Sequence, residues 1–231
     1  RRAKALVQEG AIGNLQFMEA YCKGRPPAYD LMEVAGHTLH LMYWLAGPVA
    51  WMMGHVQQEG RDATKKDAKP VSDIHPRGRA CGVGAGDYLH GYYKFASGIC
   101  GSLYLAQLES QGDNFMSVEL RGTRARLRIY QDGGGRLLFN GSPLDNSRMN
   151  PGWEIEPLKT LWNPGKGLGE LIPATGALLQ DFIQAIQECR KPQVSGEDGR
   201  AALEMGLGIY TSHLAGKRLP IPLANRKHPF E

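Results

Sequence analysis

The stretch that decides the fold is residues 88–108, YLHGYYKFASGICGSLYLAQL. Two runs of strand-forming residues, Tyr88–Phe95 and Ile99–Leu108, flank Ala96-Ser97-Gly98, which is typical of a tight turn. The stretch therefore predicts a β-hairpin. Because side chains alternate between the two faces of a strand, one face would carry Tyr88, His90 and Tyr92, and the other Leu89, Gly91 and Tyr93.

The sequence on either side of this hairpin predicts further strands of the same sheet. Val118–Leu120 and Ala125–Tyr130 flank a glycine-containing turn and indicate a second hairpin. Ile12–Cys22 and Val49–Val56 are runs of strand length, and Arg136–Phe139 adds a short one. Consecutive hairpins predict a mostly antiparallel sheet, here of four to six strands, which needs helices over one face.

The spacing of apolar residues predicts helices that could cover this face. Leu31–Leu45 has a helical pattern that ends at a Gly-Pro pair. A second apolar face consists of Leu178, Leu179, Phe182, Ile183, Ile186 and Cys189. A third helix would start at the N-cap Ser195, with Asp198 at its third position. The fold class is therefore α+β, a single domain over residues 1–231, with helices packed on one sheet face and the other face available for oligomerisation.

Composition excludes several classes of protein. The 231 residues are 42% hydrophobic and 22% charged, as in soluble globular domains, and no apolar run is long enough to span a membrane. The net charge of +4 is spread along the chain, which argues against nucleic-acid binding. Four widely spaced cysteines without a CxxC pair argue against a zinc knuckle or a disulfide scaffold. We therefore expect a cytoplasmic protein.

Two features concern a nucleotide-binding region. Gly82-Val83-Gly84-Ala85-Gly86 resembles a dinucleotide fingerprint, but it leads into a strand instead of a helix, so no Rossmann unit is expected in this chain. Arg2–Glu9 has the pattern of the last turns of a helix, closed by Gly10. We therefore expect residues 1–10 to continue from a missing N-terminal region.

The helix predicted at Leu31–Leu45 holds the candidate chemistry. Glu33, His37, His40 and Trp44 stand at i, i+4, i+7 and i+11, along one helix face. A carboxylate one turn before an imidazole can orient it and raise its pKa, which suits general acid/base catalysis on a hydroxyl or carbonyl. The alternative from spacing alone is a surface ion pair.

A metal site is a further alternative for the same residues. Glu33, His37 and His40 would supply a carboxylate and two imidazoles, and His75 or His90 would complete four ligands. Such a site would suit a metal-dependent lyase or hydrolase. The histidine spacing is looser than that of an HExxH motif, so we assign no metal ligand.

In its order of segments, the chain resembles the C-terminal domain of the glucose-fructose oxidoreductase / inositol dehydrogenase / rhizopine-catabolism (Gfo/Idh/MocA) family. The resemblance rests on residues 31–47, on the helix-to-strand junction at residues 9–13, on the hairpin at residues 93–101, and on the closing helices and tail from Phe182 to Pro222. It implies an NAD(P)-dependent oxidoreductase that transfers hydride between nicotinamide and a hydroxyl carbon of a sugar, cyclitol or related polyol.

The resemblance also implies roles for individual residues. The family's Asp-x-x-x-His motif maps onto Glu33 and His37, which makes His37 the general acid/base and Glu33 its orienting partner. His40 stands where the family commonly has Asp, and it becomes a substrate-binding residue. The loop before the helix adds Arg25, Tyr29 and Asp30 as substrate contacts.

The cofactor, NAD or NADP, would be bound mainly by an N-terminal Rossmann domain. The family's Glu-Lys-Pro motif, with its catalytic lysine, does not occur in this sequence, so the chain alone is expected to be inactive. The resemblance also implies a homodimer or homotetramer that pairs through the open sheet face. The alternative function is a non-catalytic dimerisation or ligand-binding module.

Overall fold

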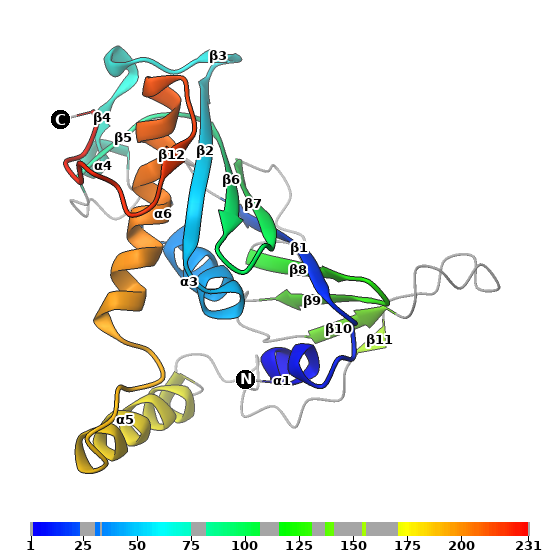
Figure 1. Ribbon diagram of the computed structural model, residues 1–231. Coiled ribbons are helices and arrows are strands. Elements are labelled where there is room, and N and C mark those ends of the chain that lie inside the picture. Colours follow the sequence, from blue (N-terminus) through cyan, green and yellow to red (C-terminus); the bar gives the residue numbers. More distant parts are fainter. Residues whose placement is uncertain are drawn as a thin grey trace.

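One large β-sheet organises the computed structural model of the chain (Figure 1). The structure describes residues 2–23, 31–32, 34–74, 82–106, 116–130, 137–140, 154–155 and 171–230. Within that part of the chain, the sheet order is β11-β10-β9-β8-β1-β7-β6-β2-β12, with β3 paired to β2. The pairing of β1 with β7 is parallel, and the other described pairings are antiparallel. The predicted mostly antiparallel α+β fold is confirmed.

The predicted strands form the centre of this sheet, and short strands extend its edges. Because β3, β11 and β12 have two residues each, no hydrophobic alternation marks them, and the expected four to six strands are too few for the described sheet. The strands are β1 (Leu15–Lys23), β2 (Val49–Gln58), β3 (Arg61–Asp62), β6 (Tyr88–Phe95), β7 (Cys100–Ala106), β8 (Met116–Gly122), β9 (Arg126–Tyr130), β10 (Leu137–Asn140), β11 (Glu154–Ile155) and β12 (Leu219–Pro220).

Helices cover one face of the sheet. The long helix α6 (Gly196–Ala215) packs on β2, and α3 (Val34–Ala46) packs against α6 and β1. The remaining helices are α1 (Arg2–Gln8), the single-turn α4 (Val71–Ile74), the 3₁₀ turn η1 (Lys65–Asp67) and α5 (Leu171–Gln187). A small separate sheet pairs β4 (Lys69–Pro70) with β5 (Val83–Gly84).

The two faces of the central hairpin differ as predicted. Leu89, Gly91 and Tyr93 of β6 are buried toward the helices, whereas Tyr88, His90 and Tyr92 are only partly buried on the opposite face. The hydroxyl of Tyr93 donates a hydrogen bond to the backbone oxygen of Met205 in α6 at 3.3 Å. The phenol is therefore satisfied in the core, and burial holds its pKa far above the ordinary value.

The approach of α6 to β2 depends on glycine. A Cβ atom at Gly54 would lie 2.3 Å from the backbone oxygen of Ile209. The amide of Gly54 also donates to the hydroxyl of Ser212 at 2.9 Å. At its other end α6 begins at the predicted N-cap: Ser195 accepts from the amide of Asp198, and the Asp198 carboxylate accepts from the amide of Ser195.

The helix α5 departs from the expectation that apolar helix faces cover the sheet. It stands away from the sheet in Figure 1. Its described large apolar side chains are more than half exposed, namely Leu178, Leu179, Phe182, Ile183 and Ile186. The buried side chains of α5 include Asp181, which accepts from Arg190 and from the amide of Gln193. The helix is thus attached through a polar contact while its apolar stripe is uncovered.

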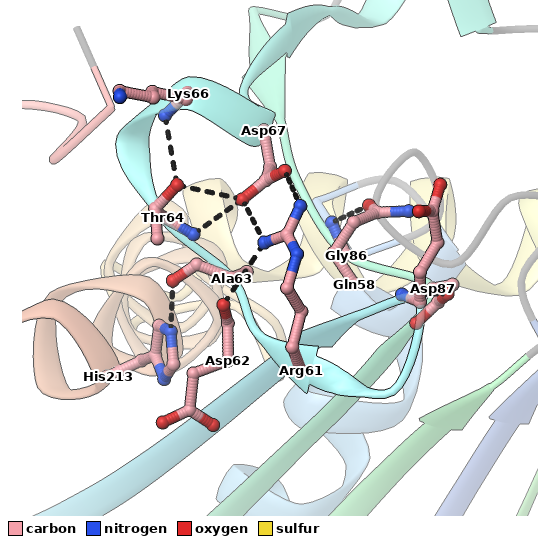
Figure 2. A network of polar contacts seen from close by, with 11 residues as sticks. Gln58, Arg61, Asp62, Ala63, Thr64, Lys66, Asp67, Gly86, Asp87 and His213 are labelled. Carbon is pink, nitrogen blue, oxygen red and sulfur yellow. Dashed lines mark hydrogen bonds and ion pairs between the residues drawn. The ribbon is translucent and has the colours of Figure 1, made fainter.

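The segment after β2 is ordered by a polar network (Figure 2). Arg61 donates two hydrogen bonds to Asp67, at 2.6 and 2.9 Å. Thr64 caps η1 by accepting from the amide of Lys66, and its hydroxyl donates to the same Asp67 carboxylate at 2.9 Å. The bonds from Arg61 and Thr64 hold the pKa of Asp67 well below its usual range. His213 of α6 donates to the backbone oxygen of Ala63 at 2.7 Å, which links the residues before η1 to helix α6.

Two further expectations concern cysteines and membranes. Within the described residues, Cys22, Cys100 and Cys189 form no disulfide, and Cys81 lies outside those residues. Among the helices that the structure describes, none combines the length and hydrophobicity of a membrane span.

Candidate functional site

The helix α3 places the predicted histidines beside a surface hollow. His37 is exposed, and His40 is half-buried one turn further along. Both line a hollow of about 200 Å³ together with Leu41, Trp44 and Val194. The helical spacing of the sequence thus brings His37, His40 and Trp44 to one place, because residues three, four and seven apart share a helix face.

A second hollow adjoins the first at the same histidines. It measures about 290 Å³ and is mainly apolar, with Met32 on one side and Ala202 and Leu203 of α6 on the other. His37, His40 and Val194 line both hollows. The two imidazoles therefore lie where the mainly apolar hollow meets the more polar first hollow. This arrangement suits a ligand that has both hydroxyl groups and hydrocarbon surface.

His40 has a free hydrogen-bonding atom at this junction. Its Nε2 is buried and has no hydrogen-bond partner among the described residues. An unpartnered buried nitrogen favours a ligand that supplies the missing bond. Asp198 lies near this junction, at the start of α6. Burial raises the pKa of Asp198, but the hydrogen bonds from Ser195 and the nearby His40 and Lys191 together outweigh that effect, so its net pKa is lowered.

Lys4 brings a positive charge to the other end of the site. Its Nζ lies 4.3 Å from the centroid of the Trp44 ring and donates to the Trp44 backbone oxygen at 3.1 Å. This cation–π contact joins α1 to the C-terminal half of α3. Sequence reasoning missed Lys4, Val194 and Leu203 because each comes from a different element, and no local pattern links them to His37.

Several predicted site residues lie outside the described part of the chain. These are Glu33, Arg25, Tyr29 and Asp30, together with His75 of the metal alternative. Their roles stay predictions.

The proposal that His90 completes a metal site is wrong. His90 lies on the sheet face opposite to the helices, whereas His40 is on α3. Within the described residues, no three His, Cys, Asp or Glu side chains are grouped so that they could hold a metal ion. The glycine-rich segment is also not a dinucleotide loop, because Val83–Gly84 is a short strand that leads into β6.

The fold and this site define a class of protein. It is an α+β domain in which one helix packs on a mostly antiparallel sheet, and two histidines of that helix line a surface hollow. The sequence profile described as "GFO/IDH/MocA C-terminal domain" matches residues 1–128. The chain belongs to this family.

Solved structures share this fold at low sequence identity. Levoglucosan dehydrogenase in complex with NADH aligns with a TM-score of 0.67 and 19% identity, over 95% of this chain and 62% of its own. The WlbA dehydrogenase from Bordetella pertussis, in complex with NADH and UDP-GlcNAcA, aligns at 0.59 and 17% identity, over 96% and 59%. An Agrobacterium radiobacter oxidoreductase, in complex with NAD+, L-tartaric acid and magnesium, aligns at 0.62 and 17%, over 95% and 60%.

The chain spans less than two thirds of the length of these structural relatives. No curated protein sequence matches it.

Proposed function

We propose that this chain is the substrate-binding domain of an NAD(P)-dependent oxidoreductase that acts on a sugar, cyclitol or related polyol. The observation that carries the proposal is the exposed imidazole of His37 at the edge of a hollow that it shares with His40. Family membership and the NADH- and sugar-related ligands of the structural relatives support it. The substrate would bind along α3, in the two hollows that meet at these histidines.

The reaction needs a proton acceptor and a hydride acceptor. His37 takes the proton of the substrate hydroxyl while the hydrogen of the same carbon leaves with its electron pair, so that a carbonyl and an imidazolium result. Nicotinamide, when bound, supplies the hydride acceptor. In the reverse direction, His37 returns the proton to the carbonyl oxygen. An exposed imidazole suits both steps, because its ring nitrogens can accept a proton from the substrate and return it.

The other predicted residues bind and orient the substrate. Glu33 orients His37 or accepts from a neighbouring hydroxyl, and the buried Nε2 of His40 provides a hydrogen bond to a second hydroxyl. Arg25, Tyr29 and Asp30 contact the substrate from the loop before α3. The apolar surface of Met32 and Leu203 faces the hydrocarbon part of the ligand.

Cofactor binding would come mainly from a dinucleotide-binding domain outside this chain. The 231 residues alone should therefore bind NAD(P) weakly and turn nothing over. Calorimetry on the isolated chain is the direct check, and a micromolar dissociation constant for NAD or NADP would contradict this part of the proposal.

The catalytic part is tested in the protein that combines this domain with a dinucleotide-binding domain. His37→Ala and His37→Gln should each lower kcat by about 100-fold or more, the usual contribution of a general base. Glu33→Gln should lower kcat less and shift its pH profile. His55→Ala is the matched control, because this half-exposed histidine lies in strand β2, away from both hollows, and bonds to Asp62 of β3. Unchanged turnover in both His37 variants would exclude the proposed role.

A second candidate function rests on the open face of the sheet. We propose that two or four copies of the protein pair through this face, which the helices leave uncovered. The face is less apolar than the sequence suggests, since it carries tyrosine, histidine, glutamate and arginine beside Met53, which is 49% exposed. If the protein is instead a non-catalytic dimerisation or ligand-binding module, its copies would still pair through this face, and the His37 variants would not change any turnover.

We also propose that the protein is cytoplasmic. The four cysteines of the sequence support this placement, because they are widely spaced and have neither a CxxC pair nor the pattern of a disulfide scaffold.

A further inference from the structure

Trp44 is the only Trp, Tyr or Phe side chain among the described residues that line the two hollows at His37. We propose that Trp44 is a specificity-determining residue whose indole stacks on the carbon–hydrogen face of a closed polyol ring, and that Lys4 is its positioning residue. The inference rests on the proposed function and narrows its substrate class, because such a contact favours cyclic polyols over open-chain ones.

The helix α3 brings the Trp44 indole close to both histidines. Trp44 follows His40 by four residues and His37 by seven, close to one and two turns, so the three side chains leave the helix on one side. Because helical side chains lean toward the N-terminus of their helix, the indole tilts back over the turn that carries His40. All three line the same hollow of about 200 Å³. In so small a hollow, a ring that bonds to the imidazoles also contacts the indole.

The three side chains contact different parts of a sugar or cyclitol ring. Its hydroxyl rim suits His37 and His40, and the buried Nε2 of His40 has no hydrogen-bond partner among the described residues. The carbon–hydrogen bonds on the ring's two faces carry a slight positive charge, whereas the face of an indole is negative. Trp44 therefore suits one face of the ring. An open-chain polyol directs hydroxyls to all sides and offers the indole no such flat face.

Lys4 of α1 fixes the plane of this indole. Its Nζ lies 4.3 Å from the centroid of the Trp44 ring, so the ammonium covers one face of the indole. Lys4 is not among the described residues that line either hollow. The hollow is therefore bounded by the part of the indole that the cation leaves free. Both side chains are partly buried, which limits the competition of water for the cation.

The same ammonium supplies a hydrogen bond that helix α3 lacks. The backbone oxygen of Trp44 would accept from the amide four residues later, but that residue is Pro48, which has no amide hydrogen. Lys4 donates to this oxygen at 3.1 Å instead. A cation near the C-terminal end of α3 also suits the helix dipole. Lys4 thus holds both the backbone and the ring of Trp44, and it acts on the substrate through Trp44.

The test uses the protein that combines this domain with a dinucleotide-binding domain, supplied with NAD or NADP. The probes are myo-inositol and glucose as closed rings and sorbitol as an open-chain polyol. Trp44→Leu should raise KM about tenfold for the ring that binds more tightly, because the buried stacking contact is lost, and less than twofold for sorbitol. A purely structural defect would affect all probes alike. The ratio of the two KM values is therefore decisive, and ligand-observed NMR measures the affinities independently of turnover.

Two variants of Lys4 test its positioning role. Lys4→Met keeps the length of the side chain but removes the charge, and it should raise KM for the same ring about threefold. Lys4→Arg retains a cation and should restore the original KM. Trp51→Leu is the matched control for Trp44→Leu. The ring of Trp51 also contacts a cation, Arg218 at 5.4 Å, but Trp51 is not among the described residues that line the hollows, so every KM should stay unchanged.

Each outcome bears on one part of the inference. An unchanged ratio of ring to open-chain KM in Trp44→Leu, an equal change in Trp51→Leu, or no saturable binding of either ring would overturn the role of Trp44. An effect of Trp44→Leu without any effect of Lys4→Met would overturn the role of Lys4. The proposed function fails separately, when both His37 variants keep full turnover. Loss of turnover in those variants with a normal ratio in Trp44→Leu would reject only the stacking contact.

Discussion

His90 links the open face of the sheet to the pH dependence of stability. Burial lowers its folded-state pKa below the unfolded value of about 6.5. The unfolded chain therefore takes up a proton at a higher pH than the folded protein does. Stability from the neutral imidazole is fully present above about pH 6.5 and is lost as the pH falls through the folded pKa. We expect His90→Gln to flatten this decrease, as measured by urea unfolding between pH 7.5 and pH 5.

Asp67 provides the control for His90. Its pKa is lowered by hydrogen bonds instead of burial, and its contribution to stability changes in a different pH range. The Arg61 hydrogen bond stabilises the charged carboxylate, so this contribution is present above the ordinary carboxyl pKa of about 3.9 and is lost only at lower pH. Asp67→Asn should leave the slope between pH 7.5 and pH 5 unchanged. An equal slope in His90→Gln and in the unmodified protein would contradict the role of His90.

At the scale of elements, the contact of β2 with α6 is the most sensitive to added volume. Gly54→Ala places a methyl group 2.3 Å from the Ile209 backbone oxygen, and neither backbone can yield without moving a strand or a helix. We expect a loss of about 2–3 kcal/mol in the free energy of unfolding, the upper part of the usual range for overpacking. Chemical denaturation measures it.

Gly199→Ala is the matched control, because Gly199 lies in α6, the helix that packs on Gly54. No atom lies within 4 Å of the added Cβ there, so the substitution should stabilise α6 by about 0.5–1 kcal/mol. If Gly54→Ala were as stable as Gly199→Ala, the close approach of β2 and α6 would be incorrect.

The central elements could be predicted because each carries its own pattern. Alternation defined Tyr88–Phe95, a capping box defined the start of α6, and helical spacing defined α3. The two-residue strands could not be predicted, since they form only where a partner strand offers free backbone groups. The apolar stripe of α5 was visible in the sequence, but its exposure was not, because a pattern does not reveal which surface covers it.

The candidate site shows the same limit at the scale of the whole molecule. The spacing of His37 and His40 sufficed to place them together, because both belong to one helix. The cation of Lys4 and the wall formed by Leu203 come from the two ends of the chain. Only the packing of α1 and α6 around α3 brings them to the histidines, and one sequence without its tertiary contacts does not contain that information.

Pairing through the open face can be decided with two charge insertions. Met53→Glu places a charge on this face, because Met53 pairs with Tyr92 in the sheet register, and in a two-fold interface the charge occurs twice. If the face pairs two copies, the dissociation constant should rise about 100-fold or more, since burying an unpaired charge is strongly unfavourable. Leu179→Glu is the matched control, on the exposed stripe of α5. Sedimentation velocity over a concentration series distinguishes the two surfaces: dissociation by Leu179→Glu alone would move the interface to α5 and contradict pairing through the sheet.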